Sequence, residues 1–404
     1  MKIFLQAPIK AGRRVDMAFV EITRHELEKN IISNKYGELD FYAYCNTPWH
    51  AIGIQSFVND LSEKKQKVSG IVFLANQPGR EAIVHPEDFN FNNNVEVLYF
   101  KNIDSHREDK KKYLKKLLFS NNADVSINDS AFYMLRPFRP DYQFGAEYQI
   151  ETEKKCELIC LEEGVGTYKS NYEIFREKIK GDTKEGVLFA ITCCFNFCLK
   201  AKYRLHISYY KLLIKQNKSL SLNKEISNMY LKTIKKAATH NKHKVSFSIA
   251  ADREYAIILT QPFEIKQDVL CKNIINQEYD LIREYLSNKG IDVYIKPHPR
   301  ESDEIIKDYR DRRFSILQSS IPLEMLLEVL PKKPIIVIGT LSTALITANA
   351  INHVRAISVI DLIKKQSNKS YVKAGIMFKR RYGNFVVFPQ NIEQILSDGC
   401  DYED

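Results

Sequence analysis

The chain has 404 residues, of which 44% are hydrophobic, and its 60 Lys and Arg exceed its 50 Asp and Glu, giving a formal net charge of +10. This length suits two or three domains. The 22 Tyr and 22 Phe, with only 15 Gly and 13 Pro, exclude a disordered or collagen-like chain. The positive charge indicates an anionic partner, which could be nucleic acid, a lipid surface or an acidic molecule or polymer.

In chain order, the first half alternates short apolar runs with helical ones, which predicts parallel strands covered by helices on both faces. Thr47 before Pro48 is a good N-cap for the helix that follows. The first 35 residues fit no sheet and suggest a helical appendage. The expected strands are 41–45, 70–74, 95–100, 123–127 and 157–161, and the expected helices are 50–61 and 107–119.

Two unusual segments occupy the middle of the chain. An apolar run of 14 residues at 186–199 falls short of the roughly 20 that a membrane-spanning helix needs, so it predicts a buried helix. Residues 200–244 then carry 12 Lys and Arg against one acid, Glu225, and this segment alone accounts for the net charge. Aromatic and aliphatic residues are interleaved with its cations, so it could bind an acidic polymer or an anionic membrane.

The second half repeats the alternation. The expected strands are 255–260, 291–296 and 334–338, and the expected helices are 277–286, 323–330 and 342–350. The whole chain therefore predicts two doubly wound, Rossmann-like α/β domains, 1–245 with a basic helical segment at 200–244, and 246–404. We expect ligand where the carboxyl ends of the two sheets face each other across a cleft.

Three motifs follow expected strands, and the first is acidic. Glu162, Glu163 and Gly164 come directly after the strand at 157–161. Adjacent carboxylates on such a turn can supply a general base whose pKa is raised by its neighbour. An ordinary acidic turn would look the same, and the residues alone do not say which glutamate is the base.

The second motif is Lys296-Pro297-His298-Pro299-Arg300, after the strand at 291–296. Two prolines stiffen the backbone around the histidine and keep the loop from becoming a helix. An imidazole held between two cations can bind a phosphate and assist a leaving group. The alternative is a rigid surface turn.

The third motif places Gly339, Ser342 and Thr343 between a strand and a helix. Free amides and hydroxyls at a helix N-terminus bind phosphate, although Ser or Thr here also suits a simple N-cap. Glu324 in the first turn of a helix could accept hydrogen bonds from a ribose, and Gln261 is a further polar group at a strand end. No Walker loop or GxGxxG occurs, and no DxD, HExxH or His/Cys cluster predicts a metal site.

The three motifs in this order resemble those of the bacterial polysialyltransferases of capsule synthesis, which carry an acidic-acidic-glycine motif, a His-Pro motif and a hydroxyl pair. The resemblance rests on EEGVGTYK at 162–169, KPHP at 296–299 and Ser342-Thr343. It implies a GT-B fold, CMP-sialic acid as donor, inversion at the anomeric carbon, and neither metal nor cofactor.

The resemblance also implies roles for single residues. Glu162 would be the general base, and His298 would engage the donor phosphate and assist the departure of CMP. Residues 246–404 would bind the CMP-sugar, and residues 1–245 the acceptor. The donor-site candidates are Gln261, Pro299, Glu324, Gly339, Ser342 and Thr343.

A polysialic acid acceptor carries one carboxylate per sugar, so a basic groove would hold several of its sugars. Any single lysine is more often part of a solvated face. The acceptor-site candidates are Arg107, Lys111, Lys115, Arg136 and Lys169.

Other functions remain open at this point. The enzyme could act on a terminal galactose of lipooligosaccharide, or use another nucleotide donor for a capsule or teichoic-type polymer. The chain could instead be a non-catalytic polyanion-binding module, but it has no nucleic-acid-binding motif and we expect no nucleic-acid partner.

The cysteines and the first residues bear on location. The eight cysteines stand in apolar surroundings without paired CxxC spacing, as reduced core thiols do. The start, MKIFLQAPIKAGRR, lacks the long apolar stretch of a secretory signal. We expect a cytoplasmic protein, with peripheral contact to the inner face of the cell membrane or to a capsule-export complex left open.

Overall fold

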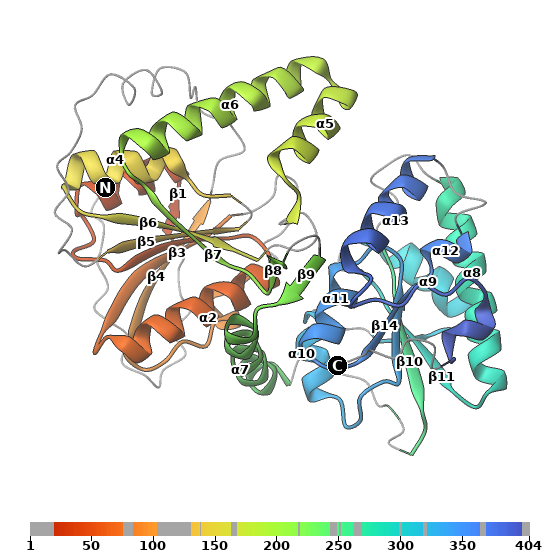
Figure 1. The fold of residues 1–404 in the computed structure, drawn as a ribbon. Coiled ribbons are helices and arrows are strands. Elements are labelled where there is room, and N and C mark those ends of the chain that lie inside the picture. Colours follow the sequence, from red (N-terminus) through yellow and green to blue (C-terminus); the bar gives the residue numbers. More distant parts are fainter. Residues whose placement is uncertain are drawn as a thin grey trace. The chain divides into compact units, whose positions relative to one another are not determined.

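The computed structural model divides into two compact units, Met1–Lys211 (unit 1) and Leu212–Asp404 (unit 2), drawn in Figure 1. The sequence analysis places the domain boundary after residue 245. The described residues are 20–75, 84–102, 131–137, 139–162, 168–216, 219–242, 249, 252–261, 269–298, 301–317, 321–363 and 369–397.

Unit 1 is built around a seven-stranded sheet with the order β1-β4-β3-β2-β5-β6-β7, and every pairing in it is parallel. Its strands are β1 (Val20–Ile22), β2 (Phe41–Cys45), β3 (Val68–Leu74), β4 (Val95–Asn102), β5 (Phe132–Pro137), β6 (Cys156–Leu161) and β7 (His206–Tyr210). Its helices are α1 (Arg24–Ile32), α2 (Pro48–Lys64), the short 3-10 helix η1 (Pro86–Asp88), α4 (Tyr142–Thr152), α5 (Asn171–Gly181) and α6 (Thr183–Lys202).

Helices cover both faces of this sheet, as its continuous apolar strands require. On one face, α1, α4 and the end of α6 share a core with the strands through Leu27, Phe144 and Leu199. On the other face, α2 contacts β2, β3 and β4. The predicted cap of α2 is confirmed, because the Thr47 hydroxyl accepts a hydrogen bond from the His50 backbone N–H at 3.2 Å.

Unit 2 contains a five-stranded parallel sheet, β12-β11-β10-β13-β14, and a two-stranded antiparallel ribbon, β8-β9. Its strands are β8 (Leu213–Gln216), β9 (Ser219–Leu222), β10 (Tyr255–Leu259), β11 (Asp292–Lys296), β12 (Ser315–Ile316), β13 (Ile336–Gly339) and β14 (Arg355–Ser358). Its helices are α7 (Lys224–His240), α8 (Val269–Asn288), α9 (Asp303–Asp311), α10 (Leu323–Val329), α11 (Thr343–Ala350), α12 (Ile360–Ile363), α13 (Lys369–Tyr382) and the 3-10 helix η5 (Ile392–Ile395).

Helices also cover both faces of the unit 2 sheet. Helices α8 and α12 share a core with one face of β10 and β13. Helix α11 contacts β13 and β14, while α10 packs against α11 and α7. The predicted α/β class, with two doubly wound parallel sheets, is confirmed.

The apolar run at 186–199 forms a helix, but the prediction that this helix is buried is wrong. Only Gly186 and Leu199 of α6 are buried, and Cys194 and Cys198, expected in the core, are exposed. Helix α4 already covers this face of the sheet, and α6 contacts α4 and α5. One side of α6 therefore packs against other helices of unit 1, and its other side is exposed to solvent.

Two further predictions need correction. The described residues of the segment 200–244 are helical at the end of α6 and in α7, and β7, β8 and β9 lie between these two helices. Of the first 35 residues, those from Val20 on are no appendage, since β1 pairs with β4 at the sheet edge and α1 packs into the core. The expected helix at 107–119 and the expected strand at 123–127 lie outside the described residues, and β5 was not predicted.

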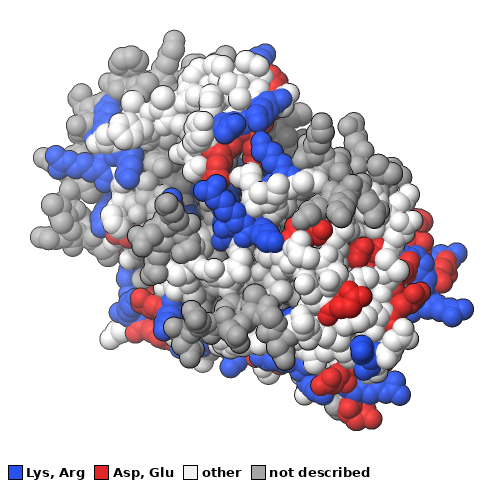
Figure 2. Space-filling view, turned by 45° about the vertical axis from the view of Figure 1, so that its right-hand side comes forward, with Lys and Arg blue, Asp and Glu red and all other residues white. Residues whose placement is uncertain are grey.

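Charge on the described surface is mixed. Figure 2 shows Lys and Arg side chains interspersed with Asp and Glu over the face that it draws. The cations of residues 200–244 are divided between the two units, because unit 1 ends at Lys211 and unit 2 begins at Leu212. The cations that are close together in the sequence at 200–244 therefore do not lie on one helix or in one unit.

Candidate functional site

In unit 2, the residues singled out by the sequence lie where parallel strands end. The strand order reverses direction between β10 and β13. Such a reversal point, at the carboxyl edge of a doubly wound sheet, is where ligands bind. Gln261 follows β10, while Gly339 ends β13 and Ser342 lies three residues further on. These candidates therefore stand on the two sides of the reversal point.

Ser342 and Thr343 begin helix α11. The Ser342 hydroxyl accepts a hydrogen bond from the Ala344 backbone N–H at 3.2 Å, which makes it the N-cap. Both residues are partly exposed. The first turn of a helix has N–H groups without partners inside the helix and carries a partial positive charge, so this end of α11 can receive a phosphate.

His298 follows β11, the neighbour of β10, and its backbone is held by the Glu301 carboxylate, which is partly buried, together with the buried Thr260. The His298 N–H donates to the Thr260 hydroxyl at 3.0 Å and to Glu301 Oε2 at 2.9 Å. Thr260 also donates to Glu301 Oε2, and the Tyr309 hydroxyl donates to Glu301 Oε1 at 3.0 Å. Glu301 thus ties the His-Pro turn to β10 and α9.

Removing this carboxylate should loosen the turn that carries His298. We expect Glu301→Ala to lower kcat by roughly 10- to 100-fold, because small misplacements of a reacting group cost that much. Tyr309→Phe, which removes one donor to Glu301 but leaves the contact with His298, should have a smaller effect. The check is steady-state kinetics beside thermal unfolding. A kcat loss no larger than that of Tyr309→Phe would contradict this positioning role.

Lys296 and Glu324 lie inside unit 2 and are both buried, 6% and 5% exposed. Burial lowers the pKa of Lys296 to about 8, although the nearby Glu324 charge raises it. Burial raises the pKa of Glu324. Hydrogen bonds to its charged form, one of them donated by the Thr347 hydroxyl, and the positive charge of Lys296 act in the opposite direction. The predicted ribose contact of Glu324 stays a prediction, and Pro299 lies outside the described residues.

In unit 1, Glu162 comes directly after β6, also at a carboxyl edge, and is 1% exposed. The Tyr168 hydroxyl donates a hydrogen bond to Glu162 Oε2. Lys211, which follows β7, lies with its Nζ 6.0 Å from the centroid of the Tyr168 ring. Burial lowers the pKa of Lys211, while the charges of Cys160 and Glu162 act in the opposite direction. The Glu162 carboxylate is thus held by a phenol in the field of an ammonium group.

Two of the predicted acceptor cations have acidic partners. Lys169 Nζ lies 2.8 Å from the Glu177 carboxylate, and Arg136 Nη1 lies 2.6 Å from Asp141 Oδ2. Arg136 also lies 5.5 Å from the centroid of the Tyr44 ring. Arg107, Lys111 and Lys115 lie outside the described residues. Acceptor binding by any of the five stays a prediction.

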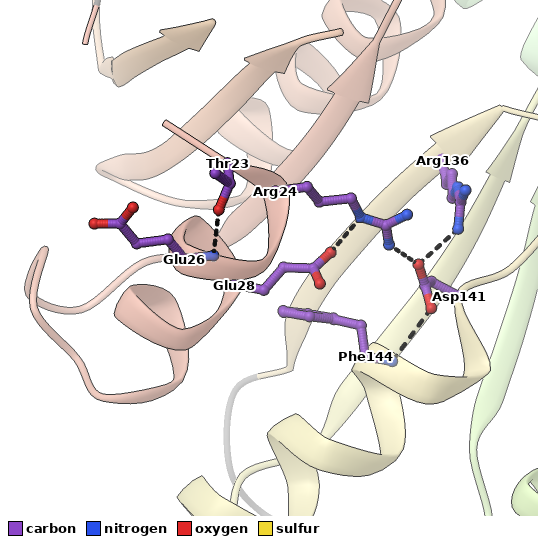
Figure 3. Close-up of polar contacts among 7 residues, drawn as sticks. All are labelled: Thr23, Arg24, Glu26, Glu28, Arg136, Asp141 and Phe144. Carbon is purple, nitrogen blue, oxygen red and sulfur yellow. Dashed lines mark hydrogen bonds and ion pairs between the residues drawn. The ribbon is translucent and has the colours of Figure 1, made fainter. Parts of the chain in front are cut away.

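Arg136 belongs to a charged cluster that Figure 3 shows in close-up. Arg24, at the start of α1, contacts Asp141 and donates to Glu28 Oε1 at 2.6 Å. Burial works against the charged form of Asp141, but Arg24 and Arg136, with the Phe144 N–H, hold its pKa well below the usual range. Burial raises the pKa of Glu28 to about 7, although Arg24 opposes this. The cluster joins α1, β5 and the start of α4.

The raised pKa of Glu28 predicts a pH dependence of stability. The folded state holds the Glu28 proton up to about pH 7, whereas the unfolded chain releases it near its ordinary pKa of about 4.5. The free energy of unfolding should therefore fall as the pH rises between these two values, by a few kcal/mol at most, and the Glu28 contribution should not change further above pH 7. We expect Glu28→Gln to flatten this decline in urea unfolding between pH 5 and pH 8. Glu26→Gln, on the exposed side of the same helix, should keep it, and equal declines in both variants would contradict the assignment.

The sequence analysis missed several residues around the candidates: Thr260, Glu301, Tyr309, Tyr168 and Lys211. One had a usable signal. Glu301 follows His298 by three residues, the spacing at which a carboxylate reaches back to a backbone N–H in a capping box. Tyr168 lies within the motif EEGVGTYK, but the motif does not show that its hydroxyl bonds Glu162. Thr260, Tyr309 and Lys211 belong to other elements of the fold, and no local pattern places them near the candidates.

The sequence matches one protein-family model over most of its length. The family described as "Alpha-2,8-polysialyltransferase (POLYST)" matches residues 42–361, which is most of the chain. The chain belongs to this family, and it is therefore a glycosyltransferase of the sialyltransferase class. The match includes Glu162, His298 and Ser342, so the resemblance drawn from three short motifs is confirmed.

Similar solved structures include two sialyltransferases and an epimerase. The α/β-galactoside α-2,3-sialyltransferase of Photobacterium phosphoreum is 12% identical, with 88% of this chain and 99% of that chain covered and a TM-score of 0.40. A sialyltransferase from Photobacterium damsela is 10% identical, with 86% and 81% covered and a TM-score of 0.43. The UDP-GlcNAc 2-epimerase of Methanocaldococcus jannaschii is 14% identical, with 89% and 90% covered and a TM-score of 0.46. No curated protein sequence matches the chain significantly.

Proposed function

We propose that this protein transfers sialic acid from CMP-sialic acid to the non-reducing end of a sialylated acceptor, with inversion and without a metal ion, and so elongates capsular polysialic acid. The observation that carries the proposal is the carboxyl edge of the unit 2 sheet. His298, whose backbone is held by Glu301 and Thr260, follows β11, which lies next to the reversal point of that sheet. Helix α11 follows β13, which lies at the reversal point.

The donor chemistry follows from these groups. When the bond between sialic acid and phosphate breaks, negative charge develops on the phosphate of CMP. The first-turn amides of α11, the hydroxyls of Ser342 and Thr343, and the imidazole of His298 can stabilise that charge. Such a set of donors performs the task that other enzymes give to a divalent cation.

The acceptor chemistry requires a base. Glu162 can take the proton from the attacking hydroxyl as the new glycosidic bond forms on the face opposite to the departing phosphate. Tyr168, hydrogen-bonded to the same carboxylate, orients it. Lys211 places positive charge near a site that must accept a polymer with one carboxylate per sugar.

The test is incubation of the purified chain with CMP-sialic acid and either a sialic acid trimer or lactose, followed by anion-exchange separation of the products. We expect a ladder of longer oligomers from the trimer and little product from lactose. A preference for lactose would instead support a galactose-directed sialyltransferase. No transfer to either acceptor, with no binding of CMP, would reject the proposal.

A further inference from the structure

Helix α6 has two apolar sides, and only one of them is packed against protein. On the packed side, Leu199 and Phe195 join the core of unit 1, and the Arg139 guanidinium lies 4.6 Å from the centroid of the Phe189 ring. Four large side chains of α6 are exposed to solvent. They are Val187, Leu188, Ile191 and Phe197, with exposed fractions of 49%, 59%, 60% and 72%.

The exposed apolar residues form a continuous stripe along α6. Val187, Ile191, Cys194 and Cys198 follow one another by three or four residues, so they lie along one line of the helix, and Leu188 and Phe197 stand on either side of that line. No charged residue occurs from 186 to 199, which makes the stripe about 21 Å long at 1.5 Å per residue. No helix among the described residues has the length and apolar character to cross a bilayer, α6 included.

The helix is built into a tight hairpin with α5. Asp182 ends α5 and caps α6, accepting a hydrogen bond from the Lys184 N–H at 2.8 Å. At Gly186 an added Cβ would lie 2.8 Å from the Cα of Ile179, so only glycine allows this close approach. The stripe is thus presented by a fixed element of unit 1, which Figure 1 shows as the pair α5 and α6.

A lysine stands at each end of the stripe. Lys184 and Lys202 are 18 residues apart, which is five turns of 3.6 residues, so they are in line with each other. Ile191 lies seven residues after Lys184 and eleven before Lys202, so both lysines fall close to the line of Ile191. Lys184 is exposed, and Lys202 is partly exposed with its Nζ 5.1 Å from the centroid of the Tyr203 ring. The exposed face of α6 is therefore apolar in the middle and positive at both ends.

We propose that this face of α6 docks the protein, without spanning, on an anionic phospholipid bilayer. Apolar side chains that enter the boundary between headgroups and acyl chains, flanked by lysines at headgroup level, are the features of an interfacial helix. A two-fold contact between copies of the chain fits less well. Pairing α6 with α6 antiparallel would bring Lys184 of one copy beside Lys202 of the other, and parallel pairing would bring each lysine beside its counterpart. An anionic surface instead neutralises both.

Vesicle flotation tests this surface independently of the transferase proposal. The purified chain should float with vesicles of phosphatidylcholine containing phosphatidylglycerol and bind pure phosphatidylcholine more weakly. Ile191→Ser with Phe197→Ser should lower partition into the anionic vesicles by at least about tenfold, because two large side chains lose their burial. Lys184→Gln with Lys202→Gln should reduce binding to the level seen with neutral vesicles.

A matched control uses exposed apolar residues elsewhere. Leu281 on α8 and Ile376 on α13 are 50% and 64% exposed, and changing both to Ser should leave vesicle binding unchanged. Thermal unfolding and molar mass by light scattering are measured for every variant. The proposal is overturned if the wild type does not float, if the Ile191/Phe197 pair floats as well as the wild type, or if that pair changes only the oligomeric mass.

Discussion

Glu162→Gln should abolish most of the transferase activity, lowering kcat by roughly 10²- to 10⁴-fold, because glutamine cannot accept the proton of the attacking hydroxyl. Its side-chain oxygen can still accept the hydrogen bond from Tyr168, so the fold should be retained. The KM for CMP-sialic acid should change little, since Glu162 is assigned to the acceptor and not to the donor. The measurement is initial-rate kinetics with the sialic acid trimer.

The same strand offers a matched control. Glu157 lies on β6 near its start and pairs with Lys155 at 2.7 Å, far along the strand from its carboxyl end. Glu157→Gln should therefore keep nearly full activity. Equal rates for Glu162→Gln and the wild type would rule out Glu162 as the base.

His298→Asn should lower kcat by roughly 10²- to 10³-fold, the usual loss when one preorganised donor to a developing negative charge is removed. Asparagine leaves the backbone N–H of residue 298 able to donate to Thr260 and Glu301, so the turn itself should persist. The effect should appear in kcat and in the affinity for CMP, measured by calorimetry, because the side chain is assigned to the phosphate.

His353→Asn is the corresponding control in unit 2. His353 is exposed and has a φ of 55°, a left-handed conformation that asparagine tolerates well. This variant should bind CMP and turn over like the wild type. A His298→Asn variant indistinguishable from it would remove histidine from the mechanism.

Much of the fold could be predicted because apolar continuity and caps are local signals. The run Phe41–Cys45 followed by Thr47 and Pro48 predicts a buried parallel strand and a capped helix, and both are found. Burial of α6 could not be predicted, because an apolar helix does not reveal whether its second face has a partner. The sheet-edge strand β1 has only three residues and gives almost no periodic signal.

The candidate site could likewise be predicted only in part. Positions at strand ends are readable, since a polar motif after an apolar run marks the carboxyl edge of a parallel sheet, as for Glu162, His298 and Ser342. The residues that hold them come from other strands and helices. Thr260 lies 38 residues from His298, and their hydrogen bond exists only because β10 pairs with β11. The cluster of Arg24, Glu28 and Asp141 likewise joins elements more than a hundred residues apart.

A crystal structure with CMP bound tests the central claim most directly. We expect the phosphate to lie at the N-terminus of α11, within hydrogen-bonding distance of Ser342 or Thr343, with the His298 imidazole turned toward it. CMP bound with its phosphate away from both the α11 N-terminus and His298 would show that these residues do not form the donor site.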